Sequence, residues 1–399
     1  MTNPKLMGQG VIPRCRHFGP CGGCSLQDRP YPAQVESKSK VLSAVLQEEI
    51  GKTPLPPLQV YSMEDPWGHR SKMEFTFGQE ADRITLGLHQ RASFQRIVDI
   101  TQCEIAPPAV SELLRAIKGA AGSFSLRSYD PKTHQGFWRY AVVRTSRSSG
   151  ELMLVLMTNE GPKEPVEAMA QLLPKAVPAL KSFYWGITSK VSDVAHPDRL
   201  ELLFGSQFLE DQVGSVRYSF GPSNFIQPNH ALVGKVYESI RQNAALTGKE
   251  AVYDLYCGMG LISLYLADAA KVVYGVESEQ ENIASAERNA AMNGISNAIF
   301  LCGRVEEVLK GRALFKQLGL APDLIVLDPP RAGLHKDVYG PLLEARVPRL
   351  MYLSCNPVSL GRDLKILLER DPAYQVESIQ MFDFFPHTVH QEVLVLLKR

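Results

Sequence analysis

The chain has 399 residues, of which 45% are hydrophobic and 21% are charged, an ordinary composition for a globular protein. It is too long for one ordinary hydrophobic core, so we expect two or three domains. The net charge of +1 neither indicates nor excludes a nucleic-acid partner, because a local basic face can lie within a balanced total. No segment approaches the roughly 20 apolar residues that span a bilayer, and the N-terminus lacks the apolar run of a signal peptide. The sequence therefore predicts a cytoplasmic protein with no membrane partner.

Three of the seven cysteines, Cys15, Cys21 and Cys24, cluster near the N-terminus with Gly-Pro and Gly-Gly between them. An odd number of cysteines without a secretion signal favours metal or catalytic use over a disulfide framework. The glycines let the backbone fold around one centre, and Cys103, in a polar stretch, is the best remote candidate for a fourth ligand. This arrangement is more typical of an iron–sulfur cluster than of zinc. Zinc and unligated thiols remain open, and His17 is an additional candidate ligand.

The next part of the chain predicts an α+β domain of roughly 140 residues. Residues 31–47 have the spacing of a helix, and the Gly- and Pro-containing residues 51–57 form a linker. Strand-like runs follow at residues 72–77, 84–89, 141–145, 152–157 and 182–188, with helical stretches at 108–119 and 164–173.

Basic and aromatic residues are interleaved in this central part. Arginine side chains that hold phosphates and rings that stack on bases suit single-stranded RNA. The alternative is a solvated sheet face above core aromatics. The residues are His69, Arg70, Lys72, Arg91, Arg96, Arg127, Lys132, Arg139, Arg144 and Arg147, with Trp67, Phe94, Phe137, Trp138 and Tyr140.

From about residue 250, short apolar strands alternate with helices, which indicates a parallel sheet. The first strand leads into Asp254-Leu-Tyr-Cys-Gly-Met-Gly260, where glycines let a ligand approach a helix N-terminus. The second ends at Glu277, a place from which a carboxylate accepts hydrogen bonds from ribose hydroxyls. The full G-x-G-x-x-G motif and a Walker lysine are both missing, so a nucleoside without pyrophosphate fits best. S-adenosyl-L-methionine is such a ligand.

The remaining strands complete a predicted seven-stranded sheet of the Rossmann-like class I methyltransferase type, with an antiparallel final hairpin. Asp328 and Cys355 each follow a strand, at the edge of the sheet where ligands bind. Cys355 lies between an apolar strand and Asn356-Pro357, so it is either a buried core thiol or a nucleophile. These strands are expected at residues 251–256, 272–276, 298–301, 323–327, 351–354, 374–382 and 391–397.

Together these motifs resemble the RNA 5-methyluridine (uracil-C5) methyltransferase family. The resemblance is strongest to the branch that carries a 4Fe-4S cluster, which is mostly specific for 23S rRNA. Only 14 residues precede Cys15, so the N-terminal TRAM domain of many members is expected to be missing and RNA docking falls to the central domain. The matching segments, in family order, are FIQPN at 225–229, DLYCGMG at 254–260, Val276-Glu277, DPPRAG at 328–333, LSCNP at 353–357 followed by Leu360-Gly-Arg-Asp363, and FPHTVHQE at 385–392.

The resemblance implies a role for each matching site residue. Cys355 is expected to add to uracil C6, and Glu392 to act as the base that removes the C5 proton. The cofactor-binding residues, which should line the S-adenosyl-L-methionine pocket, are Gln227, Tyr256, Glu277 and Asp328. The cluster ligands are Cys15, Cys21, Cys24 and Cys103.

The expected protein is a monomeric enzyme that methylates C5 of a uridine in 23S rRNA. A uridine of the tRNA T-loop is an alternative target. Amino-group methylation of nucleic acid is an alternative reaction, but enzymes of that class normally have an aromatic residue after the two prolines, where this chain has Arg331. An iron–sulfur RNA-binding protein without catalysis is a further alternative. The expected division is a cysteine-rich segment and helix at 1–60, a central RNA-binding domain at 61–220 and a methyltransferase domain at 221–399.

Overall fold

A computed structural model describes residues 10–93, 95–191, 194–310 and 321–399. The chain divides into two compact units, each of which draws on more than one segment of the sequence. The three-part division expected from the sequence stays a prediction. The first unit contains Met1–Tyr31, Asp65–Asp211 and Phe220–His230, and the second contains Pro32–Glu64, Gln212–Ser219 and Ala231–Arg399.

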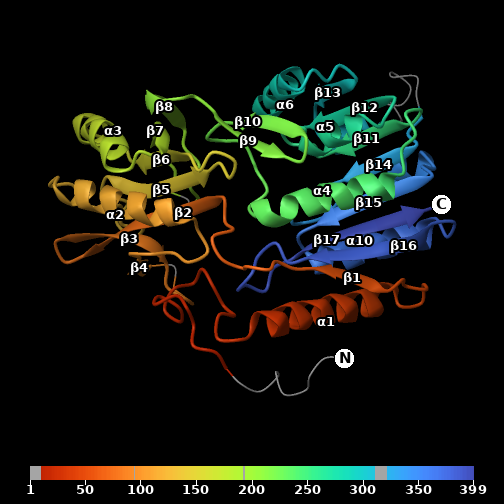
Figure 1. Cartoon of the computed structure of the whole chain (residues 1–399), viewed down its shortest axis with the longest axis horizontal. Coiled ribbons are helices and arrows are strands. Elements are labelled where there is room, and N and C mark those ends of the chain that lie inside the picture. The colour runs from red at the N-terminus through yellow and green to blue at the C-terminus, as the bar shows by residue number, and fades with distance from the viewer. Residues whose placement is uncertain (1–9, 94, 192–193, 311–320) are drawn as a thin grey trace. The chain divides into compact units, whose positions relative to one another are not determined.

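Within the described residues, the second unit is built on an eight-stranded mixed sheet in the order β1-β16-β17-β15-β14-β11-β12-β13 (Figure 1). Strand β17 runs antiparallel to its neighbours β15 and β16, and the other pairs are parallel. The strands are β1 (Leu58–Tyr61), β11 (Ala251–Leu255), β12 (Val272–Glu277), β13 (Ala298–Cys302), β14 (Leu324–Leu327), β15 (Arg349–Ser354), β16 (Gln375–Phe382) and β17 (Glu392–Lys398).

The expected count of seven strands is wrong by one. The extra strand is β1, a run of only four residues that lies far from the others in the sequence and pairs with β16 at the edge of the sheet. Such a short run after two prolines carries too little periodicity to distinguish it from a linker. The antiparallel final hairpin and the other seven strands agree with the prediction.

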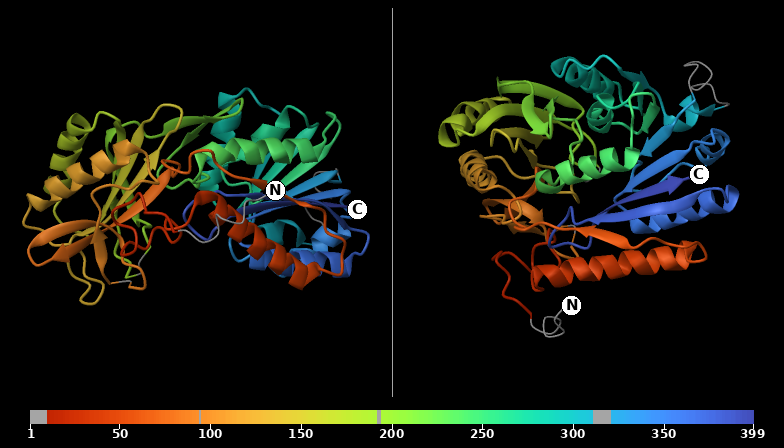
Figure 2. Two further views of the ribbon diagram at one scale, coloured as in Figure 1. Left: turned by 60° about the horizontal axis from the view of Figure 1, so that its bottom comes forward. Right: turned by 45° about the vertical axis from the view of Figure 1, so that its right-hand side comes forward.

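Helices cover the sheet of the second unit, and their apolar faces form its core. Leu42, Leu46 and Ile50 recur at intervals of four on α1 and join Leu360, Leu364 and Leu367 of α10 in one hydrophobic cluster with the strands. Both helices are visible in the two views of Figure 2. The helices are α1 (Tyr31–Ile50), α4 (His230–Ala244), α5 (Leu261–Ala267), α6 (Gln280–Met292), α7 (Val305–Val308), α9 (Tyr339–Glu344) and α10 (Pro357–Arg370).

The first unit has the predicted α+β composition. Its seven-stranded sheet has the order β4-β3-β2-β5-β6-β7-β8 in the described part of the chain, and only β6 and β7 pair in parallel. Helices α2 and α3 pack on it through Val110, Leu113 and Val166. The elements are β2 (Lys72–Glu80), β3 (Arg83–His89), β4 (Ile97–Asp99), β5 (Trp138–Thr145), β6 (Leu152–Thr158), β7 (Leu180–Ile187), β8 (Arg199–Gly205), α2 (Pro108–Gly122) and α3 (Glu164–Ala176).

A two-stranded sheet of β9 (Leu209–Val213) and β10 (Val216–Phe220) follows β8 in the sequence. No helix in the described parts of the chain is long and apolar enough to cross a membrane.

Candidate active site

Asp328, Cys355 and Glu392 lie at one edge of the second unit's sheet. Strand β14 pairs in parallel with β15, so the residues that follow them, Asp328 and Cys355, come out at the same side. Strand β17 runs the opposite way beside β15, with Ser354 opposite Val393, so its first residue, Glu392, starts next to Cys355. This is the carboxyl edge of the parallel strands, where open α/β sheets bind their ligands.

The electrostatics of these three side chains are coupled. Burial, followed by the nearby Glu392 and Asp328 carboxyls, raises the pKa of the Cys355 thiol to about 11, while Arg331 acts in the opposite direction. Burial, followed by the charge of Asp328, raises the pKa of Glu392 well above its ordinary value. Asp328 itself has its pKa raised to about 7 by burial and by Asp254. A thiol and two buried carboxyls with raised pKa values therefore share one site.

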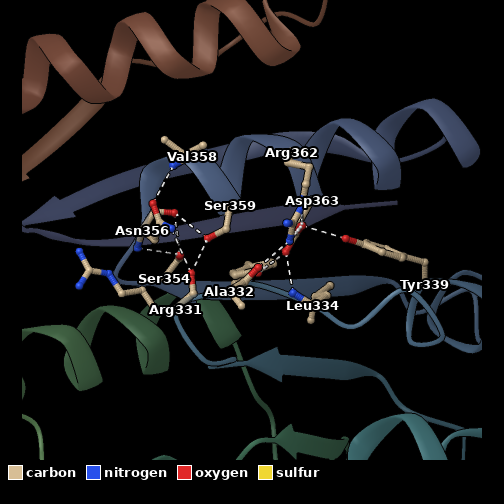
Figure 3. Close-up of polar contacts among 11 residues, drawn as sticks. Arg331, Ala332, Leu334, Tyr339, Ser354, Asn356, Val358, Ser359, Arg362 and Asp363 are labelled. Carbon is tan, nitrogen blue, oxygen red and sulfur yellow. Dashed lines mark hydrogen bonds and ion pairs between the residues drawn. The ribbon is translucent and has the colours of Figure 1, made fainter. Parts of the chain in front are cut away.

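The segment after Cys355 is tied to the loop after Asp328 (Figure 3). Asn356 caps α10 by accepting a hydrogen bond from Val358 N at 3.2 Å, and its side-chain amide donates to the carbonyl of Arg331 at 3.0 Å. Ser359 donates to the same carbonyl at 3.2 Å. The guanidinium of Arg331 extends away from this cluster in Figure 3 and lies 3.1 Å from His390 Nδ1. These bonds fix the two loops to each other.

Asp363 completes the link between these loops. Its carboxylate is fully buried and accepts hydrogen bonds from Leu334 N at 2.8 Å, the Tyr339 hydroxyl at 2.8 Å and the Tyr352 hydroxyl at 2.6 Å. Arg362 donates to it as well, at 2.7 Å. One carboxylate on α10 thus holds β15, α9 and the loop after β14 together (Figure 3).

The expected cofactor residues of the second unit lie along the same edge. Glu277 ends β12, and its Oε1 accepts hydrogen bonds from the Ser278 hydroxyl and Glu279 N, both at 3.0 Å. Its Oε2 accepts only from Gly258 N, at 3.1 Å, among the described residues, so this oxygen can accept a further hydrogen bond from a ribose hydroxyl. Tyr256 follows β11 in a left-handed backbone conformation with φ of 69°, an uncommon state that is often found at functional sites. One buried oxygen of Asp254, Oδ1, has no hydrogen-bond partner among the described residues. A buried unpaired acceptor beside a glycine loop fits a ligand with hydrogen-bond donors, such as S-adenosyl-L-methionine.

Gln227 belongs to the first unit, so its expected contact with the cofactor stays a prediction. Its backbone carbonyl accepts a hydrogen bond from the Ser71 hydroxyl at 3.1 Å, and its buried Oε1 has no partner in the described part of the chain. The neighbouring Phe225 is 64% exposed.

The four expected cluster ligands, Cys15, Cys21, Cys24 and Cys103, line one small cavity in the first unit. Burial raises the pKa of Cys24 to about 11 and that of Cys103 to about 12, and neighbouring thiols of the group act in the same direction. All seven cysteines are free. His17 was an additional candidate ligand. Its Nε2 lies 3.3 Å from both the hydroxyl oxygen and the backbone nitrogen of Thr101, so this ring nitrogen already has hydrogen-bond partners.

The described residues include no group of three or more His, Cys, Asp or Glu side chains that could hold a metal ion, so the expected cluster stays a prediction.

A groove of about 590 Å³ runs along the first unit. The groove is lined by three exposed basic side chains, those of Arg96, Arg127 and Lys132, and by the ring of Tyr129. The Arg139 guanidinium stacks over the Tyr129 ring, 4.0 Å from its centroid. The groove therefore combines positive charge with an aromatic surface.

The expectation that Arg144 faces RNA is wrong. Its side chain is fully buried and donates hydrogen bonds to the carbonyls of Gly221, Pro222 and Asn224. Arg139 is also buried, at 2% exposure, and donates to Lys190 O. Phe137 and Trp138 belong to the core, and Phe94 lies outside the described residues.

A family model described as tRNA (Uracil-5-)-methyltransferase matches residues 30–399. The chain belongs to this family. It is an RNA (uracil-5-)-methyltransferase that uses S-adenosyl-L-methionine, and its second unit has the Rossmann-like methyltransferase fold expected from the sequence.

The curated relatives include RNA methyltransferases of Halalkalibacterium halodurans and Nitratidesulfovibrio vulgaris. Each is 35% identical to this chain, over 96% of the chain and 82% of the relative. Among solved structures, the tRNA (uracil-54, C5)-methyltransferase of Pyrococcus abyssi in complex with S-adenosyl-L-homocysteine is similar, with a TM-score of 0.75 and 28% identity. That match covers 95% of this chain and 86% of the other.

Proposed function

We propose that this RNA (uracil-5-)-methyltransferase works through a covalent bond between Cys355 and C6 of the target uracil, with Glu392 as the base. The observation that carries this proposal is the meeting of a thiol, Cys355, and a buried carboxyl, Glu392, at the carboxyl edge of the sheet. Asp328 beside them and the cofactor residues farther along the same edge complete the site.

Uracil C5 is a poor nucleophile, so the enzyme first feeds electrons into the ring. The Cys355 thiolate adds to C6, and the electron pair of the C5–C6 double bond moves toward O4 to give an enolate. When bound, S-adenosyl-L-methionine supplies the electrophilic methyl group that C5 of this enolate accepts. Glu392 then takes the proton from C5 and the thiolate leaves, which restores the C5–C6 double bond.

The buried position of Glu392 suits this role. Burial and Asp328 raise its pKa, so once Glu392 has lost its own proton its carboxylate is a stronger base than that of an exposed glutamate. Tyr256, Glu277 and Asp328 hold the cofactor in this proposal, and the expected contact of Gln227 with it stays a prediction. A paired uracil hides C6, so the target uridine is unpaired or flipped out of its helix.

We infer that the groove of the first unit binds single-stranded RNA. Arg96, Arg127 and Lys132 provide phosphate contacts, and Tyr129 offers a stacking surface. This assignment keeps the expected RNA-binding role of the central domain but moves it from Arg139 and Arg144 to exposed side chains.

Cys15, Cys21, Cys24 and Cys103 hold a 4Fe-4S cluster in this proposal, because they line one cavity and are spaced as three clustered ligands and one distant one. The cluster is structural, since no step of uracil methylation needs an electron. Seven free cysteines fit a reducing compartment, so we propose a cytoplasmic protein, and we propose that it acts as a monomer.

For the substrate we propose 23S rRNA, because the cysteine pattern resembles the cluster-bearing branch of the family. The alternative, a T-loop uridine of tRNA, is favoured by the similarity to the tRNA (uracil-54, C5)-methyltransferase of Pyrococcus abyssi. Mass spectrometry of rRNA and tRNA from a deletion strain separates them. Loss of one 5-methyluridine from 23S rRNA is the expected result, and loss from tRNA alone would overturn the choice.

A further inference from the structure

One face of α1 contacts the loop that precedes the base. Gln34 and Lys38 lie one helical turn apart and are only 1% and 4% exposed, although both are polar. Farther along the same face, Leu42, Leu46 and Ile50 pack into the core of the second unit. Helix α1 therefore begins its buried face with two polar groups and continues it with apolar ones.

Both polar groups bind the segment between β16 and β17, more than 340 residues away in the sequence. Gln34 Oε1 accepts a hydrogen bond from His387 N at 3.0 Å, and its amide nitrogen lies 3.3 Å from His387 Nδ1. Lys38 forms a buried ion pair with Asp383 and donates to Phe385 O at 2.9 Å. The helix thus holds this loop at three residues within the nine that precede Glu392.

The loop adopts a conformation that needs such support. His387 has φ of 65°, in the left-handed region that a residue with a side chain rarely occupies. Strained backbone of this kind persists only where the surrounding contacts determine it. Gln34 binds the N–H of the strained residue itself, so it stabilises this conformation directly.

We propose that Gln34 and Lys38 are positioning residues for the last chemical step, because they fix the loop that sets the place of Glu392. The inference rests on the proposed function, in which Glu392 is the base. In that step the carboxylate takes the C5 proton, the C5–H electron pair becomes the C5–C6 double bond, and the bond between C6 and sulfur breaks, with its electrons leaving on the Cys355 thiolate. Addition of Cys355 to C6 comes earlier and does not use Glu392.

Formation and breakdown of the covalent adduct can be measured separately. A loss of positioning should slow breakdown alone, whereas a general loss of structure should not. We would mix Gln34→Leu and Lys38→Met variants with an unmodified RNA substrate and methyl-labelled S-adenosyl-L-methionine in single turnover. A denaturing gel then follows the covalent protein–RNA species. We expect its formation to stay within about twofold of the parent rate and its breakdown to slow about tenfold or more, so that a methylated adduct accumulates.

Two controls on the same helix match these changes. Lys40→Met makes the same substitution at an exposed lysine whose partner is Glu36, and it should leave both rates unchanged. Leu42→Ala removes buried apolar contact, so it should lower thermal stability without accumulation of the adduct. The proposal is overturned if Gln34→Leu and Lys38→Met behave like Leu42→Ala, or if formation and breakdown slow equally.

Failure of this inference differs from failure of the proposed function. Glu392→Gln, measured in parallel, should trap the adduct whatever α1 does. If it traps and the α1 variants do not, only the positioning role is lost. If Glu392→Gln turns over normally, the base itself is misassigned. Gln34→Leu leaves no buried charge unpaired, so it keeps the test decisive even if Lys38→Met does not fold.

Discussion

Replacement of Asp363 by Asn should destabilise the second unit strongly. The carboxylate is fully buried and accepts four hydrogen bonds, from Leu334 N, two tyrosine hydroxyls and Arg362. An Asn side chain keeps one oxygen, which can serve two of these donors, and places its own N–H groups against the other two. A hydrogen bond to a charged group contributes about 1.5–3 kcal/mol. Because the Tyr339 hydroxyl can rotate to accept and Arg362 can turn toward solvent, we expect a net loss of about 2–4 kcal/mol.

Differential scanning calorimetry measures this loss. In a unit of this size, 1 kcal/mol lowers the midpoint of unfolding by roughly 2–4 °C, so the transition of the second unit should fall by about 5–15 °C. That transition is identified as the one that S-adenosyl-L-methionine raises, because a ligand stabilises the folded unit that binds it. Asp337→Asn is the matched control, an exposed aspartate two positions after His335 in the same loop, and it should change the midpoint by less than about 1 °C. An equally small effect of Asp363→Asn would refute the idea that this carboxylate holds the loops together.

Three further predictions follow from the site and the first unit. Replacing Arg127 and Lys132 by Ala should weaken RNA binding and flatten its salt dependence without a change in cofactor affinity, and unchanged binding by filter assay would remove the groove from the RNA surface. Anaerobically purified protein should be brown with about four iron atoms per chain, whereas stoichiometric zinc without iron would contradict the cluster. Because burial and then Glu392 and Asp328 raise the pKa of Cys355 to about 11, the thiolate fraction of the free enzyme should rise about tenfold per pH unit. Alkylation of Cys355 by iodoacetamide, followed by peptide mass spectrometry, should therefore accelerate up to at least pH 9, and a plateau below pH 8 would show a lower pKa.

The sequence predicts the sheet of the second unit well because its central strands are buried on both faces. Runs such as Ala251–Leu255 and Leu324–Leu327 are almost continuously apolar and end at polar or glycine-rich segments, which is the pattern of parallel strands. The same reasoning placed Asp328 and Cys355 at one edge. This reasoning did not predict strand β1, because a run of four residues is too short to show periodicity and its partner β16 lies more than 300 residues away in the sequence.

The directions of side chains and the polar contacts between distant residues could not be predicted from the sequence. Arg144 lies in β5, every residue of which is buried, so alternation along the strand does not separate an inner from an outer face. Its basic charge suggested RNA, whereas the structure uses it to bind three backbone carbonyls. Asp363 belonged to a recognised motif, but nothing in the spacing shows that its carboxylate meets Tyr339 and Tyr352. Lys38, in a helix that otherwise alternates charged and apolar residues, gave no signal of its buried partner Asp383.

The central claim, that Cys355 and Glu392 act in succession on one uracil, is tested most directly by trapping the covalent intermediate. Cys355→Ala and Glu392→Gln variants are incubated with the RNA substrate and methyl-labelled S-adenosyl-L-methionine, and the products are separated on a denaturing gel. The account predicts no covalent species and no turnover for Cys355→Ala. For Glu392→Gln it predicts a labelled protein–RNA adduct that accumulates, because the amide cannot take the C5 proton. An adduct formed by Cys355→Ala, or normal turnover by Glu392→Gln, would contradict it.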